Sequence, residues 1–252
     1  MQNIILSTNK LCKTFSNGGV QQHVLINLDL EICEGDFTVI MGASGSGKST
    51  LLYSLSGMDK PSLGEVKFSG ETISKMSNDK LAVFRRKNCG FVFQQIYLMD
   101  NMSLMDNAMA GGLLLSNDRK MIADKAEDLF AKVGLTKREW KKFPAQLSGG
   151  EAQRGAIVRG LINDPAILFA DEPTGSLNSA SGEAVLDLLT EVNSSGQSVM
   201  MVTHDFKSAL RGNRILYIKD GSICGECKLP SYNGEDTTRY DQLRSFLVEM
   251  GW

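Results

Sequence analysis

The sequence predicts an α/β fold whose core is a mostly parallel sheet, with an antiparallel β subdomain at its N-terminus and an inserted helical subdomain. Three patterns lead to this prediction. Apolar and polar positions alternate through residues 4–41, apolar strands alternate with helical segments later in the chain, and a helical pattern covers about residues 98–160. At 252 residues, 42% of them hydrophobic, the chain is long enough for one large domain with a subdomain.

The first predicted elements are short antiparallel strands that form a hairpin. Residues 28–32 (LDLEI) alternate between apolar and acidic side chains and precede a turn at residues 34–36 (EGD). The apolar run at residues 37–41 (FTVIM) then predicts a buried strand, which the parallel core requires.

Later segments alternate between strand and helix patterns. Residues 64–70 and 89–93 predict two further strands, the second one buried. Strands are also expected at residues 166–170 and 198–202, with a helix over about residues 180–193 between them. This alternation is typical of a parallel α/β core, which the helical pattern at residues 98–160 interrupts.

A glycine-rich segment directly follows the apolar run at residues 37–41 and fits the phosphate-binding pattern G-x-x-x-x-G-K-[ST]. Glycines let successive backbone N–H groups face one anion, and the helix expected behind them adds partial positive charge. Lys48 can reach the β- and γ-phosphates of a nucleotide, and the Ser49 hydroxyl can bind Mg²⁺. The residues predicted to bind ATP are Gly42, Ala43, Ser44, Gly45, Ser46, Gly47, Lys48, Ser49 and Thr50. The sequence therefore predicts a P-loop NTPase core.

Two carboxylates end the strand expected at residues 166–170. Asp171 follows that apolar run, where its carboxylate can hold Mg²⁺ directly or through water. Glu172 comes next and faces the other way, so it can polarise the water that attacks a phosphate. We therefore expect Asp171 to bind the metal and Glu172 to act in catalysis.

The order of four motifs resembles that of the ATP-binding-cassette (ABC) ATPases, from about residue 4 to residue 226. The glycine-rich segment is followed by LSGGE at residues 147–151, ILFADE at residues 167–172 and VTHD at residues 202–205. These resemble the signature, the Walker B strand and the switch histidine of that family. Its activity, ATP hydrolysis with Mg²⁺, is therefore expected of this chain.

The resemblance also assigns roles to three residues outside the P-loop. It implies that His204 contacts the γ-phosphate and that Gln94 binds the metal and the attacking water, although Gln95 is an adjacent competitor. It implies that Phe15 stacks on adenine, and the alternative is that Phe15 belongs to the core. The expected catalytic residues are thus Glu172, His204 and Gln94, and the expected metal ligands are Ser49, Gln94 and Asp171.

The resemblance further implies a head-to-tail dimer in which the signature of one cassette completes the P-loop of the other. The residues expected to bind ATP in trans are Ser148, Gly149, Gly150 and Glu151. A chain with one P-loop and one signature therefore needs a second cassette, and we expect a homodimer. Asn178 stands where the family usually has an aspartate, so weaker coupling between the two sites is one consequence.

The residues that flank the motifs narrow the resemblance to one bacterial subgroup. Residues 85–87 (RRK) and residues 170–175 (ADEPTG) resemble the macrolide-export, lipoprotein-release and bacitracin-type peptide-resistance ATPases. The implied function is an ATP-hydrolysing subunit that dimerises on ATP and drives a separate permease, for export of or resistance to antimicrobial peptides or for lipoprotein or macrolide handling. The alternative is a cell-division-type ATPase that signals through its permease to wall hydrolases without transport.

Composition limits the partners and the location. A formal charge of −2 provides no basic field, so a nucleic-acid partner is not expected. No segment approaches the roughly 18 apolar residues of a membrane span, so the expected location is cytoplasmic, on the inner face of the membrane through the permease. The five scattered cysteines fit a reducing compartment, and Cys224-Gly-Glu-Cys227 is interpreted as a turn between incidental cysteines.

Two regions outside the motifs also carry expectations. The ABC ATPase domain is predicted over residues 1–227, and residues 228–252 form an extension whose helix docks through Leu243, Phe246, Leu247 and Met250. The resemblance implies that residues 96–102 form the groove for a cytoplasmic helix of the permease, with packing inside the helical subdomain as the alternative. The helix after the signature contains Gly155 and Gly160, and close packing is one possible reason.

Overall fold

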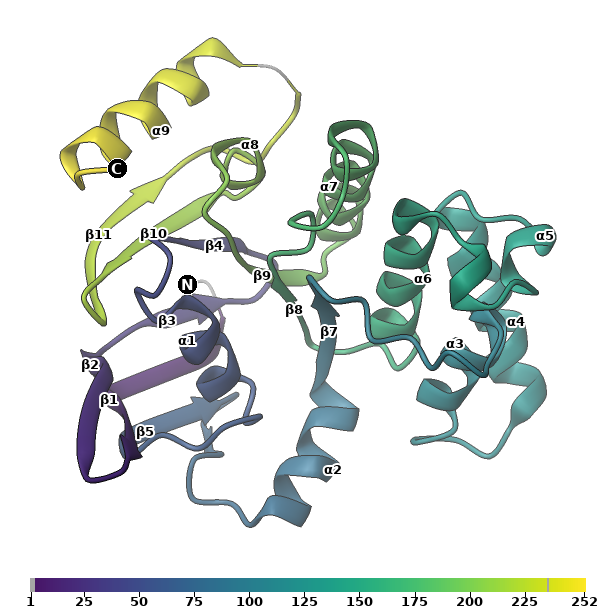
Figure 1. Ribbon diagram of the computed structural model, residues 1–252, viewed down its shortest axis with the longest axis horizontal. Helices are drawn as coiled ribbons and strands as arrows, with labels where there is room; N and C mark the ends of the chain where they lie inside the picture. Colours follow the sequence, from purple (N-terminus) through teal and green to yellow (C-terminus); the bar gives the residue numbers. More distant parts are fainter. Residues whose placement is uncertain (1–2, 235) are drawn as a thin grey trace. The chain divides into compact units, whose positions relative to one another are not determined.

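The computed structural model describes residues 3–234 and 236–252 (Figure 1). The chain forms two compact units. The first combines Met1–Leu81 with Gly196–Trp252, and the second consists of Ala82–Ser195. The second unit is therefore one continuous segment, and it is inserted between the two segments of the first unit in the sequence.

The first unit contains an antiparallel sheet, as the sequence predicts. Its strands follow the order β2-β1-β5-β6, and β3 also pairs with β1. All these pairs are antiparallel, and irregularities interrupt the register of β1 against each of its partners. The strands are β1 (Ile4–Asn17), β2 (Val20–Leu28), β3 (Glu31–Cys33), β5 (Leu63–Phe68) and β6 (Glu71–Thr72).

The first unit also contains parallel strands that lie next to one another in the order β10-β4-β9. Strand β4 (Phe37–Met41) pairs in parallel with β10 (Arg214–Lys219) on one side and with β9 (Ser198–Val202) on the other. Every residue of β4 and β9 is buried, as expected for parallel strands covered on both faces. The predicted parallel core is therefore confirmed, and α1 (Lys48–Leu55) and α8 (Phe206–Ala209) follow β4 and β9.

A hairpin closes one side of these strands, and the sequence interpretation missed it. Strand β11 (Ser222–Lys228) pairs antiparallel with β10. Cys224 and Cys227 both lie in β11, so the expected turn between them is wrong. Burial alternates along the strand, with no continuous apolar run that would have marked it from the sequence.

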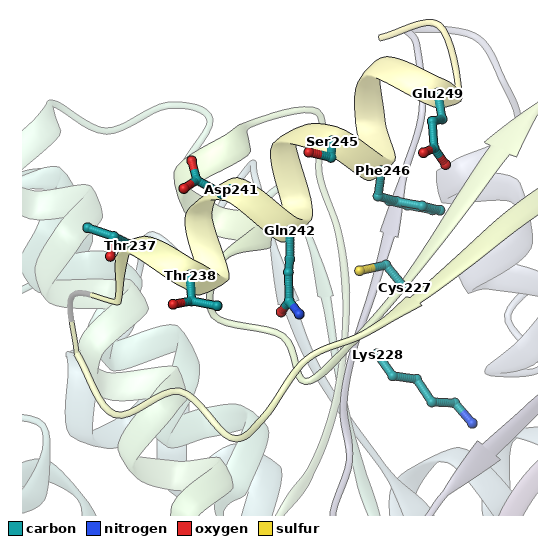
Figure 2. Close-up of a pocket in the computed structure, with 9 residues that line it drawn as sticks. All are labelled: Cys227, Lys228, Thr237, Thr238, Asp241, Gln242, Ser245, Phe246 and Glu249. Carbon is teal, nitrogen blue, oxygen red and sulfur yellow. The ribbon is translucent and has the colours of Figure 1, made fainter.

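The helix of the C-terminal extension, α9 (Thr237–Glu249), docks on this hairpin as expected. Leu243 and Leu247 are fully buried. A groove of about 550 Å³ lies between α9 and the end of β11, and Figure 2 shows its lining side chains from both elements. None of the residues predicted to bind ATP lines this groove.

The second unit contains a parallel pair of strands and two long helices. Strand β7 (Cys89–Phe93) has the predicted bounds and pairs with β8 (Ile167–Asp171), with Phe93 opposite Asp171. The helices α6 (Gly149–Leu161) and α7 (Ser179–Ser194) precede and follow β8. The helix α2 (Asn78–Asn88), which leads into β7, was not foreseen.

Short helices make up the predicted helical region of the second unit. Their core includes the fully buried Leu104 and Phe130, and the Phe130 ring stacks on Trp140 with 5.5 Å between ring centroids. The helices are α3 (Leu104–Gly112), α4 (Arg119–Lys132), α5 (Lys137–Trp140) and the 3₁₀ helix η1 (Pro144–Gln146).

Close packing accounts for the two glycines in α6. A Cβ at Gly155 would lie 2.2 Å from the Leu104 Cδ1 atom of α3. A Cβ at Gly160 would lie 3.2 Å from both the Leu168 side chain and the Phe91 carbonyl oxygen. At Gly155 the helix therefore approaches α3 more closely than a larger side chain allows, and at Gly160 a side chain would require a small shift of the β7–β8 pair.

Candidate ATP-binding and hydrolysis site

The P-loop connects β4 to α1 and depends on glycine at two positions. Gly47 has φ 102°, and a Cβ there would lie 2.9 Å from the carbonyl oxygen of Val24. A Cβ at Gly42 would lie 2.2 Å from the carbonyl oxygen of Ile218. Other residues would both strain the backbone and clash with neighbouring strands, so the loop can adopt this conformation only with glycine here.

The polar groups of the P-loop fit an anionic ligand. Lys48 is only 6% exposed, and its Nζ donates hydrogen bonds of 2.9 Å to the carbonyl oxygens of Gly42 and Ala43. In the part of the chain that the structure describes, no side chain caps α1, its first turn has no acidic residue, and the buried Ser46 Oγ has no hydrogen-bond partner. An anion at this helix N-terminus would meet positive partial charge and hydrogen-bonding groups.

Phe15 is an exposed ring rather than a core residue. It lies in β1 opposite Gln22 of β2 and is 44% exposed. The Lys13 ammonium lies 5.0 Å from the ring centroid and is itself held by Asp59 at 2.6 Å. A planar ligand could therefore stack on Phe15, and Lys13 is a contact that sequence reasoning missed.

His204 lies in the turn between β9 and α8, and its side chain is exposed. The Thr203 N–H donates a 3.1 Å hydrogen bond to the Ile40 carbonyl oxygen, which ties this turn to β4. Because β4 and β9 are parallel neighbours, the P-loop and the His204 turn begin at the same edge of the sheet. Ligands of α/β folds bind at this carboxyl edge.

The second unit contains the acidic pair at the end of β8. Asp171 is 8% exposed, whereas Glu172 is half-buried and has φ 47°. A left-handed backbone is unfavourable for a residue other than glycine, and such residues are frequent at functional sites. At Glu172 the chain leaves the direction of β8, so the two carboxylates do not share one strand face.

Gln94 lies beside this acidic pair, at the end of the neighbouring strand. It follows Phe93, which is opposite Asp171 in the register of β7 and β8. Its carbonyl oxygen accepts a 3.0 Å hydrogen bond from Ser176 Oγ. The buried Gln153 of α6 donates to the carbonyl oxygens of Phe93 at 3.0 Å and of Pro173 at 2.8 Å. Gln153 thus joins the loops after both strands, a role that motif spacing did not indicate.

The oxygen donors of the predicted metal site suit Mg²⁺. Ser49, Gln94 and Asp171 offer a hydroxyl, an amide oxygen and a carboxylate, which are hard ligands. Among residues 3–234 and 236–252, no group of three or more His, Cys, Asp or Glu side chains could hold a metal ion. Few charged ligands are typical of sites where Mg²⁺ is held largely by substrate phosphates and water.

The signature forms the start of α6 and is a complete capping box. Ser148 Oγ accepts a hydrogen bond from the Glu151 N–H at 3.3 Å, and the Glu151 carboxylate accepts one from the Ser148 N–H at 2.7 Å. Lys142 also donates to Glu151 at 3.2 Å. The Ser148 backbone N–H, followed by the Ser148 hydroxyl and Lys142, holds the pKa of Glu151 below its usual value.

Comparison with known proteins identifies the class. A profile described as ABC transporter matches residues 25–175. The structure of MJ0796, described as a dimeric bacterial ABC transporter cassette, superposes with a TM-score of 0.82 at 37% identity, covering 90% of this chain and 100% of that one. The chain therefore belongs to the ABC transporter family, as an ATP-binding domain, and the predicted recognition and fold class are confirmed.

Two curated relatives show which members it is similar to. The lipoprotein-releasing system ATP-binding protein LolD of Shewanella sp. (strain MR-4) is 40% identical over 88% of this chain and 96% of LolD. The macrolide export ATP-binding/permease protein MacB of Wolinella succinogenes is 40% identical over 88% of this chain but only 34% of MacB. The chain thus spans about a third of the length of that MacB protein. These relatives agree with the predicted subgroup and do not favour the cell-division alternative.

No helix within the described ranges has both the length and the apolar character needed to cross a bilayer.

Proposed function

We propose that the chain is the ATP-binding and ATP-hydrolysing subunit of a bacterial ABC transporter. Two copies close on ATP and drive a separate permease, for export of or resistance to antimicrobial peptides or for lipoprotein or macrolide handling. The observation that carries the proposal is the buried Lys48 ammonium, held by loop carbonyls beside a helix N-terminus that no described side chain caps. The proposed location is the inner face of the membrane, where the chain binds its permease.

Binding of ATP exchanges one set of hydrogen bonds for another. Lys48 leaves the carbonyl oxygens of Gly42 and Ala43 and donates to the β- and γ-phosphates instead. The N–H groups at the start of α1 and the Ser46 hydroxyl donate to the same phosphates. The exposed Phe15 ring stacks on adenine. Phosphate binding therefore also gives an acceptor to the buried Ser46 hydroxyl, which has no hydrogen-bond partner in the described part of the chain.

Hydrolysis uses the carboxylates and the switch histidine. Ser49, Gln94 and Asp171 would hold Mg²⁺, which would neutralise phosphate charge. Glu172 accepts a hydrogen bond from the attacking water and takes its proton as the bond to the γ-phosphorus forms and the bond to the β–γ bridging oxygen breaks, so that ADP leaves. His204 donates a hydrogen bond to the γ-phosphate, where negative charge must be stabilised.

The signature acts on the ATP of the partner cassette. Ser148, Gly149, Gly150 and Glu151 lie at the start of α6, whose N–H groups carry positive partial charge. A γ-phosphate held by the P-loop of one copy is contacted by this helix start of the other. Bound ATP then stabilises the dimer, and hydrolysis of ATP allows the two copies to separate.

An exposed apolar surface in the second unit supports a permease partner. Tyr97, Met99 and Met102 are 63%, 42% and 37% exposed. The backbone beneath them is fixed, because the fully buried Asn107 bonds to both backbone groups of Met99 and the guanidinium of Arg159 donates to the Tyr97 carbonyl oxygen. Apolar side chains presented on a rigid backbone are typical of interaction sites. This exposure does not fit the alternative in which these residues pack inside the subdomain.

Substitution of this surface tests the partner. Tyr97→Asp, with Leu98→Asp as a second variant, should leave ATP binding by the isolated chain unchanged and abolish co-purification with the permease. The exposed Met121→Asp on α4 is the control and should co-purify. Retention of the permease by both Tyr97→Asp and Leu98→Asp would place the docking surface elsewhere.

Glu172→Gln tests the proposed reaction. The substitution keeps the shape of the side chain but removes the base, so phosphate release should fall by about 10²- to 10⁴-fold while ATP still binds. A dimer that depends on ATP should accumulate, as measured by analytical ultracentrifugation. Glu183→Gln, an exposed residue of α7, is the control and should hydrolyse ATP normally. Near-normal turnover in Glu172→Gln would show that another group is the base.

A further inference from the structure

The helix α9 holds the segment that follows His204 through one buried guanidinium. Arg239 is 3% exposed, and its Nε donates a 2.6 Å hydrogen bond to the Leu210 carbonyl oxygen. Its two remaining nitrogens donate to the carbonyl oxygens of Gly212 and Pro230. A guanidinium offers these donors in a rigid plane. Arg239 therefore fixes the chain at the end of α8 relative to α9.

Aromatic contacts fix the beginning of α8 in the same way. Phe206, the first residue of α8, lies two positions after His204. Its ring meets Tyr240 of α9 edge-to-face with 4.8 Å between centroids, and meets Trp252 at 5.8 Å. A helix of four residues has little stability of its own. The position of α8 therefore depends on contacts such as these.

The His204 turn lies between two anchors. On one side, Thr203 is bonded to Ile40 of β4. On the other, Asp205 caps α8, because its carboxylate accepts 2.7 Å hydrogen bonds from the N–H and the hydroxyl of Ser208. The first anchor belongs to a buried sheet and the second to the short α8. A shift at the start of α8 would therefore be transmitted to His204.

The docking of α9 on β11 depends on the glycine at position 225, which has no side chain. A Cβ at Gly225 of β11 would lie 2.6 Å from Met250 Sδ and 3.0 Å from a ring carbon of Phe246. Figure 2 shows Phe246 extending from α9 over the strand that carries Cys227. The strand thus provides a surface that α9 can approach closely.

We propose that α9 is a positioning element for the switch histidine, with Arg239 and Tyr240 as its positioning residues. The inference rests on the proposed role of His204 in hydrolysis. A docked α9 keeps α8, and with it His204, in place to contact the γ-phosphate. The rate of hydrolysis then depends on α9, whereas the affinity of the P-loop for ATP does not.

Substitution of Tyr240 separates these two quantities. Tyr240→Ala should lower kcat by about 2- to 10-fold, the range set by the free energy of one aromatic pair, and leave KM for ATP unchanged. Tyr240→Phe retains the ring and should restore kcat. Val248→Ala, at an exposed position of the same helix, is the matched control and should behave as the unsubstituted chain. An unchanged kcat in Tyr240→Ala, or an equal fall in Tyr240→Phe, would overturn the proposal.

A double-mutant cycle tests whether the effect passes through His204. Tyr240→Ala should cause no further loss in a chain that already carries His204→Ala. The same fold-loss in both backgrounds would mean that Tyr240 acts elsewhere, and the proposal would be wrong. Full activity of His204→Ala alone would instead contradict the role of His204 in the proposed function.

A spectroscopic measurement gives an answer without turnover. The chain has two tryptophans, so Trp140→Phe leaves Trp252 as the only one. In Glu172→Gln, addition of ATP should change Trp252 emission, because Trp252 contacts Phe206. His204→Ala should abolish this change while equilibrium dialysis still shows bound ATP. If Trp252 emission does not change on addition of ATP while His204 is present, α9 and the histidine are not coupled.

Discussion

Two helices of this protein begin beside glycines, but their N-termini are capped differently. At α1 the N-cap is Gly47 in a left-handed conformation, and neither a side-chain cap nor an acidic first-turn residue occurs there among the described residues. At α6 the N-cap is Ser148, which exchanges hydrogen bonds with Glu151 in a closed capping box. One helix start is open to an anion, and the other is completed by its own side chains.

The difference shows that two helix starts in one protein can be ordered by different means. The open end of α1 gains hydrogen bonds when a phosphate arrives, so its order depends on the ligand. The closed end of α6 is ordered without a ligand, because a capping box satisfies backbone donors locally. The start of α1 is therefore open to a ligand, and the start of α6 is rigid without one.

The largest expected effect separates the two ends directly. Lys48→Ala should weaken ATP binding by about 10- to 100-fold, since hydrogen bonds to charged groups contribute about 1.5–3 kcal/mol each. Ser148→Arg should bind ATP normally as a monomer but fail to form the ATP-dependent dimer. Isothermal titration and ultracentrifugation measure the two outcomes.

A mixture of these two chains sharpens the comparison. One composite site then carries neither substitution, so part of the ATPase activity should return if a single site can work. Full activity of Ser148→Arg alone, measured with the permease present, would refute the composite site.

A second prediction concerns the packing that holds α6 in place. Gly155→Ala should lower the free energy of unfolding by about 1–3 kcal/mol, because the new Cβ overlaps Leu104 in a filled core. The cost should exceed the gain of about 1 kcal/mol in helix propensity. Gly182→Ala in α7 is the control, since its nearest contact would be an ordinary 3.6 Å, and it should not destabilise the chain. Urea denaturation measures both, and equal stability of the two variants would contradict the packing argument.

The smallest expected effect tests the carboxylate of the closed end. Hydrogen bonds from Ser148 lower the pKa of Glu151 in the folded chain. A lowered folded pKa adds stability above the ordinary carboxyl pKa, and this stability is lost as pH falls through the folded value. Glu151→Gln should therefore cost about 0.3–1 kcal/mol near pH 7, and this difference should disappear as pH falls through the lowered pKa of Glu151. Denaturation curves measured at pH 7 and at successively lower pH test this prediction. A stability difference that persists at low pH would contradict it.

Motifs and apolar runs account for what the sequence predicted well. The predicted bounds of β7 and β9 are those observed, and the predicted bounds of β8 differ by one residue at each end. Each of these strands is a continuous apolar run. The hairpin β10–β11 and the helix α2 were missed. The polar sequence of α2 and the alternating burial of β11 give no comparable signal.

The same distinction applies to the site. Lys48 and Glu172 belong to contiguous motifs, so spacing alone was enough to predict them. Gln153, Lys13 and Arg239 act through contacts with residues distant in sequence, such as the 2.8 Å bond from Gln153 to Pro173. Such contacts exist only after the strands have paired, and a single sequence does not reveal them.

The alternation of burial along β11 has a consequence for thiol chemistry. Cys224 is exposed, whereas Cys227 is half-buried in the α9 groove, where burial raises its pKa. The strand thus presents the two sulfurs on different faces, and they cannot approach closely enough for a disulfide. Alkylating reagents should reach Cys224 first, and mild oxidation should join it to an external thiol while Cys227 stays reduced beneath the helix.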